Sequence, residues 1–155
     1  MKTQVIKFLR GFGYAFRGIF TAICKERNFR FHLCAGLFVL VLSAFYPFGR
    51  AEYLIIILCI AGVMGTELMN TAVERAADKP DGAYSPYAKE AKDIAAGAVL
   101  AVSGGAFVCG VWLFWDMAVF HEIALFFSKN LWAAAVGGAY IIASIWFVFG
   151  FQKKE

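Results

Sequence analysis

Four long apolar runs divide the chain, and most of its polar residues fall between them. The runs are Phe31–Phe48, Ala51–Val73, Ile94–Trp115 and Leu131–Phe151. Each is close to the roughly 20 residues that an α-helix needs to cross a bilayer. The pattern therefore predicts four transmembrane helices.

The segment before the first run repeats its apolar residues every three or four positions, from Thr3 to Lys25. Basic side chains, among them Lys7, Arg10 and Arg17, occupy another face of the same helix. Such a helix lies in the membrane interface with its basic side toward headgroups and water. We therefore predict an N-terminal amphipathic surface helix, for which a plain membrane anchor is the alternative role.

Composition supports a membrane protein. Hydrophobic residues make up 61% of the 155 positions and charged residues 17%, which is far from the balance of a soluble domain. The four cysteines have no CxxC spacing and no neighbouring histidine cluster, so we interpret them as packing residues and not as zinc ligands. The sequence thus predicts an all-α integral membrane protein.

The basic residues indicate how the chain is oriented. Thirteen of the 15 Lys and Arg residues precede the first run, join the second run to the third, or follow the fourth. Only Arg50 and Lys129 fall in the other two connections. Because basic residues are retained on the cytoplasmic side, we expect both termini in the cytoplasm. The net charge of +4 follows from this asymmetry and gives little reason to expect nucleic acid as a partner.

The later part of the chain carries two further signals. Gly97, Ala101 and Gly104 or Gly105 lie nearly on one stripe of the third run, which predicts close packing against another helix. The aromatic-rich residues Asp116–Asn130 are typical of an interfacial segment on the outer side.

A polar face ends the second apolar run. Glu67, Asn70, Glu74 and Asp78 are spaced by three, four and four residues, so on a helix they project from one side. After a short loop, a second helix brings Lys92 to the same membrane boundary. Ionisable residues at membrane depth are costly and indicate a functional site.

Carboxylates, an amide and a lysine at a membrane surface suit Mg²⁺-assisted phosphoryl transfer. Mg²⁺ binds one or two carboxylates together with substrate phosphates, and a further carboxylate can accept a proton from an attacking hydroxyl. A proton or cation pathway is equally compatible with buried acids, and a catalytically inactive membrane adaptor is a third reading. Glu26, between Lys25, Arg27 and Arg30, is either an ion-paired interfacial residue or part of the site.

Four motifs resemble those of the small prokaryotic lipid kinases, the family of diacylglycerol kinase and undecaprenol kinase. They are GYAFRG (Gly13–Gly18), ERNFRFH (Glu26–His32), ELMNTAVERAAD (Glu67–Asp78) and AKEAKDIAAGAV (Ala88–Val99). Their order and spacing are those of the family, and the similarity extends over Gly13–Trp115. The resemblance implies an ATP- and Mg²⁺-dependent kinase that phosphorylates a membrane lipid alcohol.

The resemblance also implies roles for the acids. Glu67 corresponds to the catalytic base that takes the proton from the lipid hydroxyl, and Asn70 helps to orient the site. Glu26 and Glu74 correspond to the acids that hold Mg²⁺ against ATP. Asp78 receives no role.

Four further residues align with nucleotide contacts of the family: Lys7, Tyr14, Lys92 and Asp93. The family implies a homotrimer whose active sites include residues of adjacent subunits. It also implies the cytoplasmic membrane of a bacterium, with the active site and both termini on the cytoplasmic side.

The chain departs from the family in two places. Ala83-Tyr84-Ser85 stands where Gram-negative relatives have Glu-Tyr-His, so a carboxylate and an imidazole near the nucleotide are missing. A fourth span also follows the usual three. We therefore divide the chain into a lipid kinase core, residues 1–116, and an outer loop with an additional C-terminal transmembrane helix, residues 117–155.

The wording of two motifs bears on the substrate. NTAVE and AKDIAAGAV look more like the Gram-positive undecaprenol kinases than the Gram-negative diacylglycerol kinases. Undecaprenol is therefore the expected substrate and diacylglycerol the alternative.

Overall fold

The computed structural model describes residues 2–78 and 85–151, and every regular element in these ranges is helical. The elements are α1 (Lys2–Lys25), α2 (Arg27–Ser43), α3 (Arg50–Ala77), α4 (Pro86–Phe114), α5 (Met117–Lys129), α6 (Leu131–Ile145) and a π-helical turn, η1 (Trp146–Gly150). The all-α prediction is confirmed. Ala83 and Tyr84 lie outside the described residues, and so do three of the thirteen basic residues that indicate the orientation, Lys79, Lys153 and Lys154.

Three helices of the described chain are long and apolar enough to cross a membrane. They are α3, α4 and the continuous stretch Leu131–Gly150, which joins α6 to η1. The chain is therefore an integral membrane protein. Helix α2 has 17 residues, at the lower end of the roughly 17–25 that span a bilayer, so the count of four spans stays a prediction.

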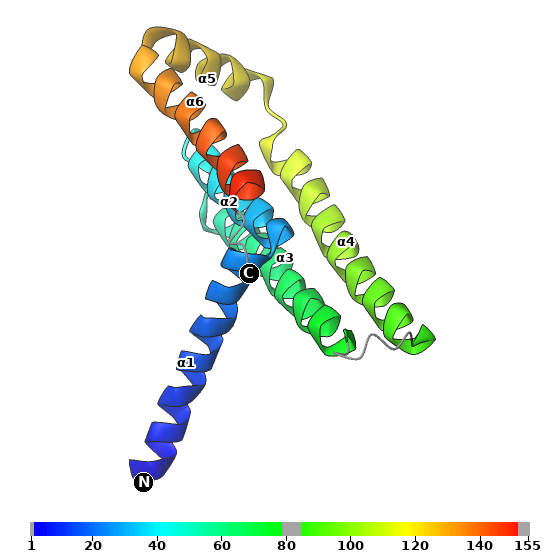
Figure 1. Ribbon diagram of the computed structural model, residues 1–155. Helices are drawn as coiled ribbons and strands as arrows, with labels where there is room; N and C mark the ends of the chain where they lie inside the picture. Colours follow the sequence, from blue (N-terminus) through cyan, green and yellow to red (C-terminus); the bar gives the residue numbers. More distant parts are fainter. Residues whose placement is uncertain (1, 79–84, 152–155) are drawn as a thin grey trace.

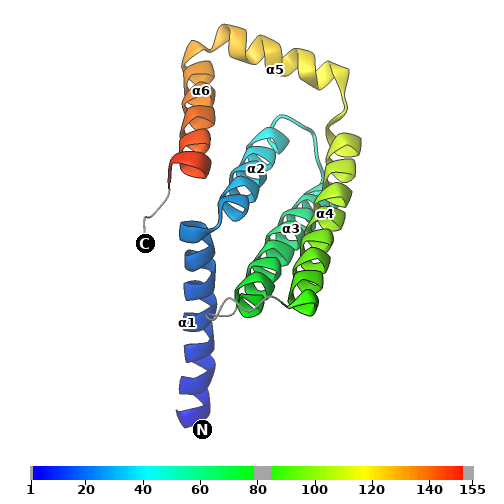
Figure 2. The ribbon, with the colours of Figure 1, turned by 45° about the vertical axis from the view of Figure 1, so that its right-hand side comes forward.

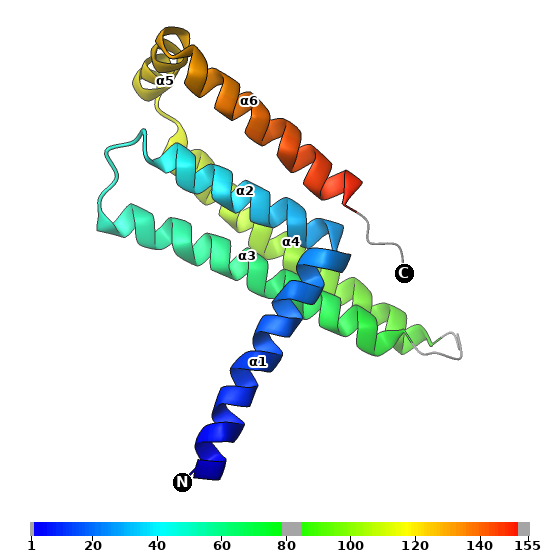
Figure 3. The ribbon, with the colours of Figure 1, turned by 60° about the vertical axis from the view of Figure 1, so that its left-hand side comes forward.

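Helix α3 runs antiparallel to both α2 and α4 and is in contact with both (Figure 3). One glycine permits the close approach of α2 to α3. A Cβ atom at Gly36 of α2 would lie 3.1 Å from Ile60 Cγ2 of α3, whereas one at Gly62 of α3 would lie in ordinary contact, 3.5 Å from Val102 Cγ1 of α4. The absence of a side chain at Gly36 therefore lets the backbones of α2 and α3 pack closely.

The stripe of small residues on α4 does not contact α3. Nothing among the described residues lies within 4 Å of a Cβ position at Gly97, Gly104 or Gly105, and Ala101 is exposed. The expected close packing through this stripe is therefore wrong within one chain. The period of a helix places Val102 on a different face from the stripe, and that face meets α3.

An aromatic cluster fixes the end of α3 that lies far from the acids. Tyr46, Ile56, Phe114 and Val119 form its buried centre. The Tyr46 hydroxyl donates a hydrogen bond to the Phe114 carbonyl at 2.7 Å, and the two rings meet edge to face. The cluster thus joins the α2–α3 turn to the end of α4 and the start of α5.

The predicted outer segment is a helix. Asp116 caps the N-terminus of α5 by accepting hydrogen bonds from the backbone N–H groups of Ala118 and Val119. Helix α5 crosses from the end of α4 to α6, which returns along α2 (Figure 2). The Tyr140 hydroxyl donates to the Cys34 carbonyl at 2.6 Å, so the additional C-terminal helix is anchored on α2.

Arg30 makes the second anchor of this helix. Only 2% of its surface is exposed, and its guanidinium donates to the Val148 carbonyl at 3.1 Å and to the Ile23 carbonyl, also at 3.1 Å. The last carbonyls of a helix lack partners within the helix, so Arg30 satisfies such groups at two helix ends at once. It therefore ties α1, α2 and η1 together.

Helix α1 projects away from the other helices (Figure 1). Residues 4–20 are exposed along the whole segment, and the first buried residue is Ala22. The predicted N-terminal helix is present with bounds close to those expected. Its position on a membrane surface stays a prediction.

Candidate active site

The predicted polar face forms on α3. Glu67 is 3% exposed and Asn70 7% exposed, and Glu74 is half-buried one turn further along. Helix α3 continues past its apolar run to Ala77, which keeps these three residues on one side. Asp78 follows the helix in extended conformation and is exposed, so it leaves that face.

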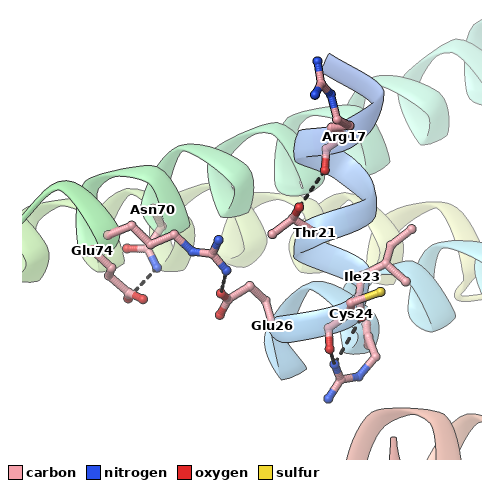
Figure 4. A network of polar contacts seen from close by, with 9 residues as sticks. Arg17, Thr21, Ile23, Cys24, Glu26, Asn70 and Glu74 are labelled. Atoms are coloured by element: carbon pink, nitrogen blue, oxygen red, sulfur yellow. Dashed lines mark hydrogen bonds and ion pairs between the residues drawn. The ribbon is translucent and has the colours of Figure 1, made fainter. Parts of the chain in front are cut away.

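Asn70 orients one of the acids. Its Nδ2 donates a hydrogen bond to Glu74 Oε1 at 2.8 Å (Figure 4), the contact expected for residues four apart on a helix. The Asn70 Oδ1 atom is buried and has no hydrogen-bond partner among the described residues. A buried acceptor without a hydrogen bond lowers the stability of the fold. A ligand hydroxyl that donated a hydrogen bond to this atom would remove that cost.

Glu26 reaches α3 from the junction of α1 and α2 (Figure 4). Its backbone is extended, with φ −103° and ψ 113°, and its Oε1 atom accepts a hydrogen bond from Arg75 Nη2 at 2.8 Å. The side chains of Glu26 and Arg75 are 27% and 44% exposed. Glu26 is therefore both ion-paired and adjacent to the polar end of α3.

Carboxylates from two parts of the chain lie within electrostatic range of Glu67. Glu26 and Glu74 both act electrostatically on Glu67, and the Asn28 side chain lies beside the Glu67 carboxyl. Like charges in a partly buried site repel one another. The site therefore favours cationic ligands that reduce this repulsion.

A second ion pair closes the same end of the helix pair. Lys92 of α4 donates to Asp78 Oδ1 at 2.8 Å, and the two side chains are 37% and 69% exposed. The expectation that these two helices bring complementary charge together is confirmed. Asp78, which had no role in the sequence analysis, thus links the end of α3 to the start of α4.

Comparison with known proteins identifies the family of the chain. Residues 13–114 match the family model of prokaryotic diacylglycerol kinase. The chain belongs to this family. Proteins of the family are lipid kinases, and this membrane protein is a lipid kinase, with ATP as the phosphoryl donor that such kinases use.

Three relatives of the kinase illustrate the range of the family. Undecaprenol kinase of Bacillus subtilis (strain 168) is 36% identical over 113 residues, which cover 73% of this chain and 92% of that protein. A diacylglycerol kinase of Synechocystis sp. is 37% identical over 66% of this chain and 59% of the relative. The diacylglycerol kinase of Escherichia coli (strain K12) is 26% identical over 63% of this chain and 80% of the relative. No solved structure matches the chain significantly.

The donor atoms of the kinase site fit a hard cation. Within residues 2–78 and 85–151, no group of three or more His, Cys, Asp and Glu side chains could by itself hold a metal ion. Mg²⁺ does not require such a group, because it commonly binds through one or two carboxylates, waters and substrate phosphates. Glu26 at the α1–α2 junction and Glu74 on α3 carry oxygen donors of this type.

The connection between α3 and α4 is described from Ser85 onward. Ser85 accepts a hydrogen bond from the backbone N–H of Ala88 and so caps α4, and Pro86 begins the helix, where its missing N–H carries no penalty. Ser85, one of the residues that depart from the family pattern, therefore has a structural role. Asp93 is exposed on the first turns of α4.

Two predicted nucleotide contacts lie apart from the acids. Lys7 and Tyr14 are exposed on the projecting part of α1, and the Arg17 guanidinium lies 4.8 Å from the centre of the Tyr14 ring. Within the described part of one chain, these two residues are not brought to Glu67 or Glu74.

Sequence reasoning missed two residues of the site. Asn28 lies beside Glu67, and the ERNFRFH motif, which places it two residues after Glu26, carried the signal. Arg75 contacts Glu26 across a separation of 49 residues. It was counted only as a marker of orientation, because no local pattern connects it to Glu26.

Proposed function

We propose that this kinase transfers the terminal phosphoryl group of ATP to the hydroxyl of undecaprenol and so forms undecaprenyl phosphate. The reaction takes place at the cytoplasmic face of the bacterial cell membrane, with both termini of the chain inside the cell. The observation that carries the proposal is the burial of Glu67 beside Glu26 and Glu74 at the end of an apolar helix. The relation to an undecaprenol kinase over 92% of that protein supports the substrate.

Glu67 is the general base in this proposal. Its carboxylate accepts the proton of the lipid hydroxyl while the hydroxyl oxygen attacks the terminal phosphorus, and the bond from that phosphorus to the bridging oxygen breaks. A positioned base contributes roughly 10²–10⁴-fold to the rate. The free Oδ1 atom of Asn70 supports a role in orienting the hydroxyl, because it is a buried acceptor one turn from Glu67.

Glu26 and Glu74 hold Mg²⁺, which when bound neutralises phosphate charge. Asn70 fixes the orientation of Glu74 through its hydrogen bond, and hydrogen bonds of this kind typically tune the affinity of a metal site. Lys92 and Asp93 contact the nucleotide from the start of α4.

We propose a homotrimer with shared active sites. Lys7 and Tyr14 lie away from the acids of their own chain, so as nucleotide contacts they serve the site of a neighbouring copy. The uncovered stripe of small residues on α4 and the exposed apolar side chains of α1 are suited to packing between copies.

Diacylglycerol is the second candidate substrate. The relatives from Synechocystis and Escherichia coli carry the name diacylglycerol kinase, and the former is 37% identical. An apolar pocket discriminates weakly between hydrocarbon chains of similar bulk. One protein can therefore accept both lipids at different rates.

The test is a side-by-side assay of undecaprenol and diacylglycerol in mixed micelles with labelled ATP and Mg²⁺. We expect label in both lipids or in undecaprenol alone, with the larger kcat/KM for undecaprenol. A larger value for diacylglycerol would refute the proposed substrate. Label in neither lipid, together with ion flux in ATP-free proteoliposomes, would refute the kinase reaction in favour of a conducting bundle.

A further inference from the structure

Arg75 forms an ion pair with Glu26, one of the two acids that the proposed function assigns to the metal. Its Nη2 atom lies 2.8 Å from Glu26 Oε1, and it follows Glu74 directly in the sequence. A guanidinium and a divalent cation compete for the charge of the same carboxylate. A cation of the chain itself therefore lies at the place where the metal is expected.

The contact is of a kind that can exchange. The Arg75 side chain is 44% exposed and that of Glu26 27%, and ion pairs exposed to water contribute about 1 kcal/mol or less. Arg30 differs, because it is 2% exposed and donates to backbone carbonyls of two helix ends. Arg75 is thus free to change partners without loss of a buried contact.

Lys92, a further cation at this end of the helix pair, is engaged elsewhere. It pairs with Asp78 beyond the end of α3, whereas Arg75 lies directly on an acid of the site. A nucleotide whose phosphates share a metal with Glu26 and Glu74 comes within reach of Arg75. The planar fork of a guanidinium matches the oxygen atoms of a phosphate and can donate two parallel hydrogen bonds to it.

We propose that Arg75 is a phosphate-binding residue that exchanges partners. It pairs with Glu26 in the ligand-free kinase and turns to the phosphate oxygens of the nucleotide when nucleotide and metal bind. Arg75 thereby balances the Glu26 charge in the empty site and the phosphate charge in the filled one. This inference rests on the proposed metal-binding role of Glu26.

The exchange predicts two effects of opposite sign for Arg75→Gln in the full-length purified kinase. Mn²⁺ alone, measured by electron paramagnetic resonance, should bind at least about threefold more tightly, because the competitor for Glu26 is gone. A non-hydrolysable ATP analogue with Mg²⁺, measured by equilibrium dialysis, should bind about tenfold more weakly, because a charged hydrogen bond to phosphate is lost. Binding of adenosine, which has no phosphate, should not change.

Two variants control the experiment. Arg75→Lys keeps the charge and should retain more of the analogue affinity than Arg75→Gln. Arg50→Gln makes the same chemical change at the exposed other end of α3 and should leave both affinities as in the wild type. Each variant must elute from a sizing column as the wild type does.

Weaker binding of both Mn²⁺ and the analogue by Arg75→Gln would overturn the exchange, since it would mean that Arg75 merely holds Glu26 in place. Unchanged binding of both would also overturn it. Failure of the wild type itself to bind Mn²⁺ and the analogue would instead count against the proposed function. The two failures are therefore distinct.

Discussion

Replacing Glu67 by glutamine should lower turnover and raise thermal stability together. The substitution keeps the shape of the side chain but removes its charge and its ability to accept a proton. Glu67 is 3% exposed and lies in the field of two other carboxylates. A group selected for chemistry in such a place destabilises the fold, which is the usual trade-off at active sites.

The two magnitudes follow from different principles. Loss of a general base lowers the rate by roughly 10²–10⁴-fold, or about 3–5 kcal/mol in the activation barrier. Relief of burial and like-charge repulsion should stabilise the fold by about 1 kcal/mol. For a chain of 155 residues that corresponds to about 2–4 °C in the midpoint of thermal unfolding.

Both effects can be measured on one preparation in detergent. Initial rates with labelled ATP and saturating lipid give turnover, and tryptophan fluorescence during heating gives the midpoint. Glu122→Gln is the matched control, because Glu122 is exposed on α5, and it should change neither quantity. Turnover of Glu67→Gln within threefold of wild type would rule out Glu67 as the base. Lost turnover with a lower midpoint would show damaged packing instead.

Three further predictions concern the contacts around this site and at the far end of the helices. Asn70→Ala removes the donor that orients Glu74 and should raise the Mg²⁺ concentration for half-maximal rate by about tenfold, as a Mg²⁺ titration will test. Lys92→Gln breaks an exposed pair with Asp78, so the thermal midpoint should fall by no more than about 4 °C. The KM for ATP should rise severalfold if Lys92 contacts phosphate, and an unchanged KM would remove it from the nucleotide site. Tyr46→Phe loses a buried hydrogen bond and should destabilise the fold by about 1–2 kcal/mol in a thermal melt, while kcat stays at the wild-type value.

The apolar pattern located the helices but not where they end. The second run reaches Val73, whereas α3 continues to Ala77, because polar residues in its last turns find partners in Glu26 and in one another. Helix α4 begins at Pro86, eight residues before the third apolar run, where Ser85 supplies the cap. A hydropathy pattern indicates which residues lie in the lipid. A helix continues beyond the lipid when its end is capped or when its polar side chains form hydrogen bonds or ion pairs.

In the site, likewise, some contacts can be predicted from spacing along the chain and others depend on how the helices pack. Contact between Asn70 and Glu74 follows from helical spacing, and the structure confirms it. The contact between Glu26 and Arg75 depends on how the α1–α2 junction packs against α3, which spacing along the chain does not encode. The same limit applies to the anchors of the C-terminal helix, which join residues 118 and 106 positions apart.

The separation of the aromatic cluster from the acids bears on how the protein can adapt. Ile56 in the cluster and Glu74 in the site are 18 residues apart on one helix, or about 27 Å at 1.5 Å per residue. Effects of substitutions that far apart usually add independently. Mutations at the aromatic end can therefore accumulate to suit a warmer habitat or a thicker bilayer while the chemistry of the acids stays as it is. This end of the molecule is the place to begin when a heat-tolerant variant is engineered.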